Sequence, residues 1–234
     1  TAFTYRFHAW LGTWENVDAF LPLTAYAKHL LLLGRLSIPE ERIEVKPNFI
    51  EPLTPVSGER ESYFLFIGRL SEEKGLRQLL HAFNRPDAPP LRIIGDGPLR
   101  NLLNNLVNPD FRHLGYLSRE KIGEYIAHCK GIVVPSVCLE GFPLALLEGF
   151  SLKTPVILSQ EVAASEVIED GKNGFLVDPQ DFFEKLKAID EYPGLEQIGE
   201  EGFKTYESRF TKEKVMHLLE EVYRKVLRQS AFPG

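Results

Sequence analysis

The chain has 234 residues, of which 33 are acidic and 27 basic, so its formal net charge is −6 at pH 7. Hydrophobic residues make up 44% and charged residues 26%, close to the averages of globular proteins, which excludes disorder, collagen-like repeats and coiled coil. The acidic balance argues against a broad DNA- or RNA-binding surface, which needs a basic surplus. We therefore expect a folded enzyme or binding domain that binds no nucleic acid.

The sequence begins with Thr1, and its only methionine is Met216. The first residues lack the basic start and apolar stretch of a signal peptide, so we expect a fragment of a longer chain. No apolar run is long enough to span a bilayer. Two cysteines, Cys129 and Cys138, are too few for a disulfide scaffold. These features predict a cytoplasmic protein without a transmembrane segment, in solution or peripheral at the inner face of the membrane.

The first sixty residues predict two short strands and one helix; the second strand lies in the segment IEVKPNF, after Ile38-Pro39. From Val17 a buried strand leads into a helix, with Thr24 as its N-cap and Gly34 as its end. A proline-rich stretch follows between Pro47 and Pro55. Because prolines stiffen the chain and interrupt helices and strands, this stretch is typical of a linker between domains.

After residue 60, short β-branched or aromatic runs alternate with segments of helical spacing. This alternation predicts an α/β domain with a Rossmann-like parallel sheet and helices on both faces, because each crossover returns the chain to the same edge. Ligands of such sheets bind beyond the carboxyl ends of the strands. The predicted strands are 63–68, 91–95, 111–115, 131–135, 155–159 and 174–177. The predicted helices are 73–84, 98–107, 118–128, 143–151 and 163–169, followed by a largely helical region from 181 to 227.

The loop after the first predicted strand reads GRLSEEKG and carries two cations. Gly68 would let a ligand approach the backbone closely, while Arg69 and Lys74 would lie near the start of the next helix. Two cations and free helix amides together favour a bound diphosphate. An ordinary charged turn would use the same residues, so this loop alone leaves both interpretations open.

The loop after the second predicted strand, GDGPLR, matches only the first two glycines of a dinucleotide-binding fingerprint. Arg100 stands at the third glycine position, and the loop follows the second strand rather than the first. A tight turn is therefore a better interpretation than a dehydrogenase site. Pro98 would be the first helical residue, with Asp96 near the N-cap.

The stretch VPSVCLEGFPLALLEGF places two carboxylates around the start of a helix opened by Pro143. Glu140 precedes the helix and can face a sugar hydroxyl or a developing positive charge, whereas Glu148 would reach a polyol such as ribose. Two glutamates at this spacing also arise by chance in an acidic protein. The Gly-Phe-Pro turn between them and the buried strand before it are what distinguish this stretch from a chance spacing. Free amides of the first turn can hold phosphate or sugar oxygens, and they belong to Gly141, Phe142 and Leu144.

Several common chemistries lack their motif. The sequence has no DxD metal–diphosphate signature, GxSxG elbow, GxxxxGK[ST] phosphate loop or histidine pair at metal-ligand spacing. We therefore expect no metal site and no cofactor. His128 and Cys129 are neighbours on a predicted helix and point in different directions, which argues against a nucleophile and its base. All six histidines are expected in structural or surface roles: His8, His29, His81, His113, His128 and His217.

Six segments, in order, resemble the retaining, nucleotide-sugar-dependent glycosyltransferases of the GT-B fold, known as group 1 or glycosyltransferase family four. The resemblance runs from about Val17 to Tyr223. It implies two Rossmann-like domains across a cleft, with this chain mainly the C-terminal, donor-binding domain. The segments are VKPNF, FIGRLSEEKGLRQLLHAF, LRIIGDGPLR, HLGYLSREKIGEYIAHC, EGFPLALLE and PVILSQEVAASEVIEDGKNGFLVDPQD.

The resemblance also implies a role for each matching residue. Arg69 and Lys74 would grip the donor diphosphate and stabilise the departing nucleoside diphosphate, which fits a metal-independent enzyme without DxD. Glu140 would lie beside the donor sugar and Glu148 would bind the ribose. The catalytic set is thus Glu140, Arg69 and Lys74. The donor-binding set is Gly68, Arg69, Lys74, Tyr116, Leu117, Glu140, Gly141, Phe142, Leu144 and Glu148, with the backbone near Tyr116 and Leu117 bordering the base.

Such enzymes are hexosyltransferase-type and retain the anomeric configuration. The residues leave two mechanisms open, same-face attack and double displacement, and Glu140 is the candidate nucleophile for the second. Two positions depart from the family pattern: Lys153 stands where a glycine commonly closes a helix, and Val162-Ala163 replaces a glycine-containing turn before Glu166. Donor-sugar specificity is the property that these departures put in doubt.

The resemblance divides the chain into four parts. Residues 1–46 would be a remnant of the N-terminal acceptor domain, 47–60 a proline-rich linker, 61–210 the nucleotide-sugar-binding domain and 211–234 a C-terminal helix. The acceptor, a saccharide, lipid or small molecule, would bind through the missing part, so this fragment alone should be inactive in transfer. Two alternatives are a non-catalytic nucleotide-sugar-binding module and a nucleotide-sugar epimerase of the same fold.

Overall fold

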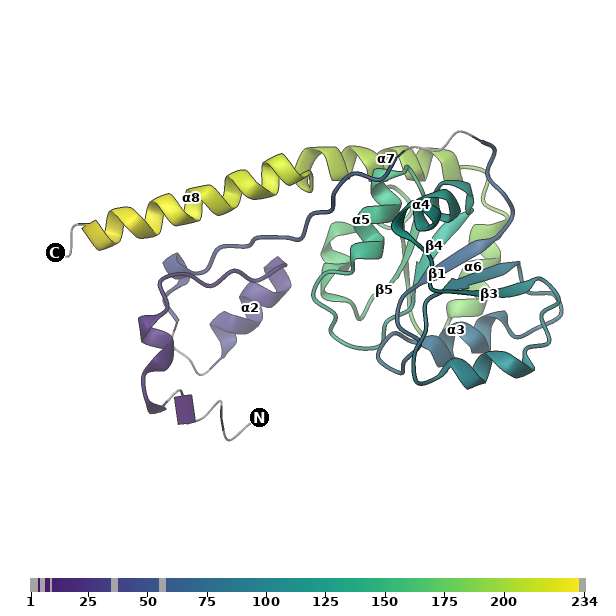
Figure 1. The fold of residues 1–234 in the computed structure, drawn as a ribbon, viewed down its shortest axis with the longest axis horizontal. Coiled ribbons are helices and arrows are strands. Elements are labelled where there is room, and N and C mark those ends of the chain that lie inside the picture. The colour runs from purple at the N-terminus through teal and green to yellow at the C-terminus, as the bar shows by residue number, and fades with distance from the viewer. Residues whose placement is uncertain (1–3, 5–6, 9, 35–37, 55–57, 232–234) are drawn as a thin grey trace.

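A computed structural model describes residues 4, 7–8, 10–34, 38–54 and 58–231. Its centre is a six-stranded, wholly parallel sheet in the order β3-β2-β1-β4-β5-β6 (Figure 1). The strands are β1 (Phe64–Ile67), β2 (Leu91–Ile94), β3 (Phe111–Gly115), β4 (Gly131–Val134), β5 (Val156–Ser159) and β6 (Phe175–Val177). All six predicted strands are therefore confirmed.

The strand order places the functional edge of the sheet. The chain moves outward from β1 through β2 to β3, then returns to the other side of β1 as β4 and moves outward again. This is the order of dinucleotide-binding Rossmann sheets, whose ligands bind where the direction reverses. The loops after β1 and β4 meet at that point.

Helices cover both faces of the sheet, and successive side chains along a strand point into two different cores. Phe64 and Phe66 of β1 join one core, while Leu65 between them joins the other. The first core contains side chains of α3 (Leu76–Phe83) and α6 (Phe182–Asp190). The second contains side chains of α4 (Arg119–His128), α5 (Leu144–Ser151) and α7 (Leu195–Arg209). Burial on both faces explains why the strands read as continuous apolar runs.

Three helix predictions are corrected by the structure. The predicted helix 73–84 begins only at Leu76, because Gly75 has a left-handed φ of 69°. The segments 98–107 and 163–169 form 3-10 helices, at Arg100–Asn105 and Ala163–Val167. Their short lengths, and the prolines and glycines that flank them, suit the tighter helix better than an α-helix.

The described residues before the sheet, up to residue 46, are called the N-terminal segment; they contain α2 (Ala25–Leu33) and the 3-10 helices Thr13–Asn16 and Glu40–Arg42. α2 has Thr24 as its N-cap, whose Oγ1 accepts a hydrogen bond from the Ala27 amide at 3.0 Å, and its C-cap is Gly34, as predicted. The strands predicted from Val17 and in IEVKPNF are both wrong: in the described part of the chain, an isolated bridge between Phe20 and Ile43 stands in their place. Parts of the predicted divisions 1–46, 47–60 and 211–234 lie outside the described residues.

A long C-terminal helix connects the sheet domain with the N-terminal segment. α8 (Lys212–Ala231) continues from α7 and reaches out over the N-terminal segment in Figure 1. Lys225 Nζ lies 2.6 Å from Glu44 Oε1, and Lys212 Nζ lies 2.6 Å from Glu51 Oε1. These ion pairs join α8 to the part of the chain that precedes the sheet.

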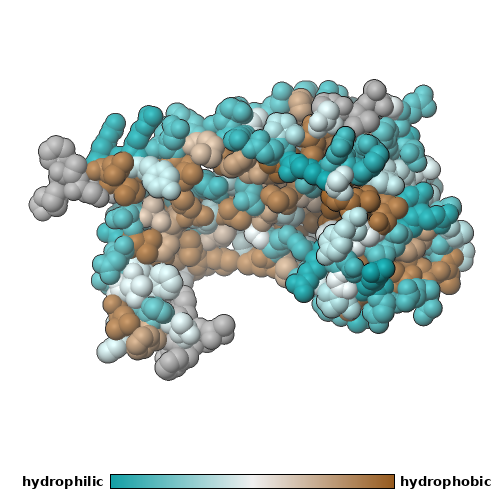
Figure 2. Space-filling model, viewed as in Figure 1, coloured by the Kyte–Doolittle hydropathy of each residue, from teal (hydrophilic) through white to brown (hydrophobic). Residues whose placement is uncertain are grey.

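Apolar side chains gather on this part of the surface. Figure 2 shows hydrophobic surface over α8 and the N-terminal segment. Leu33 of α2 and Leu227 of α8 are among the exposed large apolar side chains. Among the described residues, no helix combines the length and hydropathy needed to cross a membrane.

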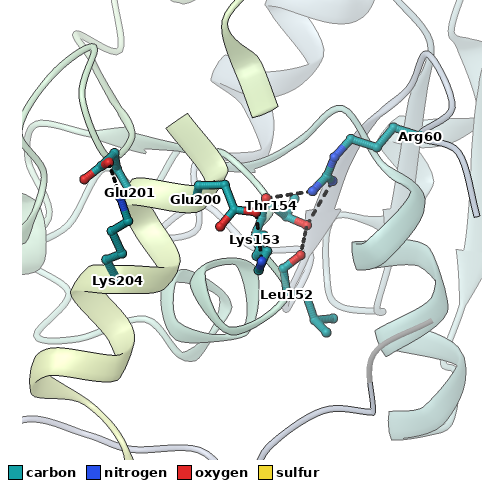
Figure 3. Close-up of polar contacts among 7 residues, drawn as sticks. All are labelled: Arg60, Leu152, Lys153, Thr154, Glu200, Glu201 and Lys204. Carbon is teal, nitrogen blue, oxygen red and sulfur yellow. Dashed lines mark hydrogen bonds and ion pairs between the residues drawn. The ribbon is translucent and has the colours of Figure 1, made fainter. Parts of the chain in front are cut away.

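The end of the linker is fixed by Arg60 (Figure 3). Its guanidinium donates to the carbonyl of Cys129 at 2.9 Å and to that of Lys153 at 2.6 Å. Lys153 has a φ of 56°, so it occupies the left-handed conformation that a glycine would adopt more readily. Its ammonium lies 2.8 Å from Glu200 Oε1, which gives this lysine a partner that glycine could not have.

Candidate functional site

The loops after β1 and β4 are locked together at the reversal point of the sheet. The Val137 amide donates to the Glu73 carbonyl at 3.2 Å. A Cβ on Gly75 would lie 1.8 Å from the carbonyl oxygen of Pro135. Only glycine therefore allows this close approach, which brings the loop that carries Lys74 against the end of β4.

The close approach places Lys74 and Glu140 in contact. Lys74 Nζ forms an ion pair with Glu140 Oε1, and the two side chains are 31% and 18% exposed. The Ser136 hydroxyl donates to the other carboxylate oxygen of Glu140 at 2.7 Å. Both oxygens of Glu140 are thus occupied, so its carboxylate is held in one orientation beside the loop after β1.

Ser136 is a site residue that the sequence reasoning missed. It is 1% exposed and follows Pro135 at the end of β4. The only signal was a small hydroxyl four residues before Glu140, in the stretch VPSVCLE. That spacing predicts no contact until the loop is known to turn back on itself.

A neighbouring cavity of about 700 Å³ gathers four more of the predicted residues. Gly68, Arg69, Tyr116 and Leu117 line it, together with residues of the loop after β2. The Arg69 guanidinium forms no hydrogen bond or ion pair with any described residue, so it is available to a ligand. The Tyr116 side chain is 80% exposed at the rim. The size is typical of a small-molecule site.

The loop after β2 forms the wall of this cavity and is a tight turn, as predicted. A Cβ on Gly97 would lie 2.4 Å from the Leu70 carbonyl oxygen, so the turn packs directly against the loop after β1. The details of its helix start are corrected. Asp96 accepts from the Gly97 amide at 2.7 Å instead of capping a helix, and the 3-10 helix begins at Arg100 rather than at Pro98.

The predicted amides lie at the start of α5. Among the described residues, the N–H groups of Gly141, Phe142 and Leu144 donate to no backbone acceptor, so they are free for an anion. The Phe142 ring has a different role, because it is buried against Phe210 with ring centroids 5.4 Å apart. Its carbonyl accepts from Asn48 at 3.1 Å, which ties the linker to this loop.

Glu148 takes no part in the ion pair of Lys74 with Glu140. It lies within α5, and among the described residues its carboxylate accepts no hydrogen bond. Burial raises the pKa of the Glu148 carboxyl above its ordinary value of 4.5, while the Arg119 charge partly opposes this rise. A buried carboxylate without a hydrogen-bond donor is suited to hydroxyl groups that a ligand would bring.

The Glu148→Gln variant should be more stable than the natural chain at pH 8 and equally stable at pH 4. Because the folded state raises the pKa, it holds the proton more tightly than the unfolded chain, so Glu148 lowers stability as the pH rises above 4.5. Melting temperatures across this range measure the effect, with exposed Glu207→Gln as the control. A stability difference that does not grow with pH would contradict this account.

The histidines and cysteines form no second candidate site in the described part of the chain. No group of three or more His, Cys, Asp or Glu side chains there is placed to hold a metal ion. His128 Nδ1 lies 2.9 Å from the Glu124 carbonyl oxygen. Cys129 is fully buried, and burial raises the pKa of its thiol to about 12, so it is not a reactive thiolate.

Comparison with known sequences gives a consistent family. The family model described as "Glycosyl transferases group 1" matches residues 54–205. An uncharacterized glycosyltransferase of Methanocaldococcus jannaschii is 30% identical over 173 residues, which cover 70% of this chain and 48% of that protein. A GDP-mannose-dependent alpha-mannosyltransferase of Corynebacterium glutamicum is 34% identical over 127 residues, which cover 54% of this chain and 30% of that protein. The chain thus spans half or less of the length of these relatives.

Solved structures give the same fold. The chain resembles a sucrose-phosphate synthase of Thermosynechococcus elongatus with a TM-score of 0.80 and 21% identity, over 92% of this chain and 59% of the other. It also resembles the Anabaena protein HepE, solved with UDP and glucose. The TM-score is 0.74 and the identity 17%, over 90% of this chain and 63% of that protein. At these identities the likeness shows the fold alone.

Proposed function

The chain belongs to the group 1 glycosyl transferases, and from this premise we propose that it is the donor-binding half of a retaining glycosyltransferase. The enzyme would move a sugar from a nucleotide-diphosphate donor to an acceptor. The observation that carries the proposal is the contact of Lys74 with Glu140 at the sheet's reversal point, beside a cavity lined by Arg69. This arrangement puts cations and a fixed carboxylate where a Rossmann sheet binds its ligand.

The proposed chemistry needs positive charge at the leaving group. When the bond between the sugar carbon and the phosphate oxygen breaks, its electron pair stays on the nucleoside diphosphate. Arg69, Lys74 and the free amides before α5 would stabilise that charge without a metal ion. Glu140, fixed by Ser136 and Lys74, would face the positive charge that develops on the sugar.

The cavity beside Tyr116 and Leu117 would hold the base, and Glu148 would bind the ribose. Names of similar proteins support donors of this class, since one relative depends on GDP-mannose and one structural neighbour was solved with UDP. The proposal therefore covers UDP-, GDP- and ADP-sugars.

We propose that the chain is divided between acceptor and donor binding. Residues 1–46 would be the end of an acceptor domain, 47–60 the linker, 61–210 the donor domain and 211–234 the helix that returns toward the acceptor side. The acceptor would bind mainly outside this chain, so we expect donor binding with little or no transfer. A cytoplasmic location, in solution or at the inner face of the membrane, is part of this proposal.

Calorimetry with UDP, GDP and ADP tests the proposal. We expect at least one of them to bind the folded chain, with the same affinity in EDTA as in buffer, because fixed cations hold the diphosphate. Failure of all three to bind at millimolar concentration would refute the donor-site assignment. Binding that disappears in EDTA would refute the metal-independent part alone.

Two alternative functions predict different products. A binding module would hold the donor in the longer protein without transferring or hydrolysing it. An epimerase would release free epimerised sugar rather than a glycoside. The paired Lys74 and Glu140 favour transfer, because a leaving diphosphate and a developing sugar cation each find an opposite charge there.

A further inference from the structure

The Glu166 carboxylate of the donor domain binds the start of a helix in the N-terminal segment. Its Oε1 accepts from the Ala25 amide and its Oε2 from the Tyr26 amide, both at 2.8 Å. These are two of the free N–H groups in the first turn of α2, where the positive end of the helix dipole favours a carboxylate. The contact thus joins Tyr26 of α2 to a residue 140 positions later in the sequence.

The helix α2 lies against the 3-10 helix that carries Glu166. None of the residues of α2, which lies wholly within the described chain, is buried. Glu166 lines two cavities at this junction, of about 430 and 540 Å³. The two charge-assisted hydrogen bonds therefore join the elements at a contact where α2 buries no side chain completely.

A short path of contacts connects Glu166 with the proposed donor loop. The Ala163 amide, in the same 3-10 helix as Glu166, donates to the Glu140 carbonyl at 2.9 Å. Leu23, just before α2, approaches Gly141: a Cβ on this glycine would lie 3.4 Å from Leu23 Cδ1. The start of α2 therefore sits directly against the loop that carries Glu140.

We propose that Glu166 is a positioning residue that sets the N-terminal segment against the Glu140 loop. Among the described residues its carboxylate accepts hydrogen bonds from the Ala25 and Tyr26 amides and from no predicted donor-binding residue, so it acts through the placement of α2. Its expected effect on sugar transfer rests on the proposed function, because acceptor and donor must be aligned across this junction. The placement itself does not depend on the proposed function and can be measured without ligand.

NMR of the full chain tests the placement. In Glu166→Ala, amide exchange at Ala25 and Tyr26 should accelerate about tenfold or more, as expected when a capping acceptor is removed. The nuclear Overhauser effect between the Leu23 methyl groups and the Gly141 α-protons should weaken or disappear. Glu166→Gln keeps one acceptor oxygen but no charge. Its exchange rates and its Leu23–Gly141 signal should lie between those of the natural chain and those of Glu166→Ala.

Two control variants separate positioning from helix stability. Thr24→Val removes the hydroxyl that caps the Ala27 amide while preserving size, so it should expose Ala27 and leave the Leu23–Gly141 signal intact. Glu161→Gln changes another carboxylate at the same cavity and should change neither signal. Nucleotide affinity should stay within about twofold of the natural chain in Glu166→Ala, because donor contacts are unaltered.

Unchanged exchange and an unchanged Leu23–Gly141 signal in Glu166→Ala would overturn the proposal. Equal loss of that signal in Thr24→Val would also overturn it, since Glu166 would then act only through helix stability. Failure of the natural chain to bind nucleotide would count against the proposed function but not against this contact.

Discussion

The Lys74→Ala variant should bind its preferred nucleoside diphosphate about 10- to 100-fold more weakly than the natural chain. A hydrogen bond to a charged group contributes about 1.5–3 kcal/mol, which corresponds to this range of affinity. In the ligand-free chain Lys74 pairs with Glu140, which presents its ammonium at the loop where the diphosphate would arrive. Calorimetry with the nucleotide that the natural chain binds measures the loss.

A matched lysine distinguishes this site from general surface charge. Lys172 pairs with Glu169 on the surface, so Lys172→Ala removes the same charge and an ion pair away from the proposed site. Its nucleotide affinity should equal that of the natural chain at physiological salt, where distant exposed charges are screened. Equal losses in both variants would show that Lys74 acts only through net charge, and no loss in either would remove it from the donor site.

In the Gly75→Ala variant the free energy of unfolding should fall by about 2–5 kcal/mol, and the variant should bind no nucleotide. Gly75 has a left-handed φ of 69°, which costs a residue with a Cβ about 1–2 kcal/mol. The added methyl would also lie 1.8 Å from the Pro135 carbonyl, and overpacking of this kind costs a further 1–3 kcal/mol or so. Relief of the clash must separate the loops after β1 and β4, and Lys74 moves with its loop.

Gly171 provides the control for backbone strain. Its φ is 74°, nearly that of Gly75, but a Cβ there would meet nothing within 4 Å. Gly171→Ala should therefore lose only about 1–2 kcal/mol and should keep nucleotide affinity. Urea denaturation with equal slopes gives both free energies of unfolding. If the two variants are equally stable, the contact of Gly75 with Pro135 is unimportant.

The 3-10 helices show where local patterns were insufficient. The segments around Leu103 and Ala164 have apolar residues at helical spacing, which an α-helix and a 3-10 helix of one or two turns share. The strand predicted from Val17 failed for another reason. A short apolar run forms a strand only where a partner continues the ladder of hydrogen bonds. Among the described residues, the run is joined to the chain around Ile43 by hydrogen bonds at Phe20 and Pro22, and these amount to one isolated bridge because proline has no N–H to donate.

Local sequence was sufficient for the strands of the sheet domain, and it named the residue types of the candidate site. Apolar runs such as that of Phe64 to Ile67 predicted strands because burial on both faces demands them, and Gly, Lys and Glu marked loops with distinct backbone and charge requirements. Contacts between distant parts of the chain were beyond such patterns. The pairing of Lys74 with Glu140 and the hydrogen bonds of Glu166 to α2 join residues that share no periodicity. The first exists because the strand order 3-2-1-4-5-6 sets the loops after β1 and β4 side by side, and the second because the segment after β5 meets the N-terminal segment; both depend on how whole elements pack rather than on any one segment.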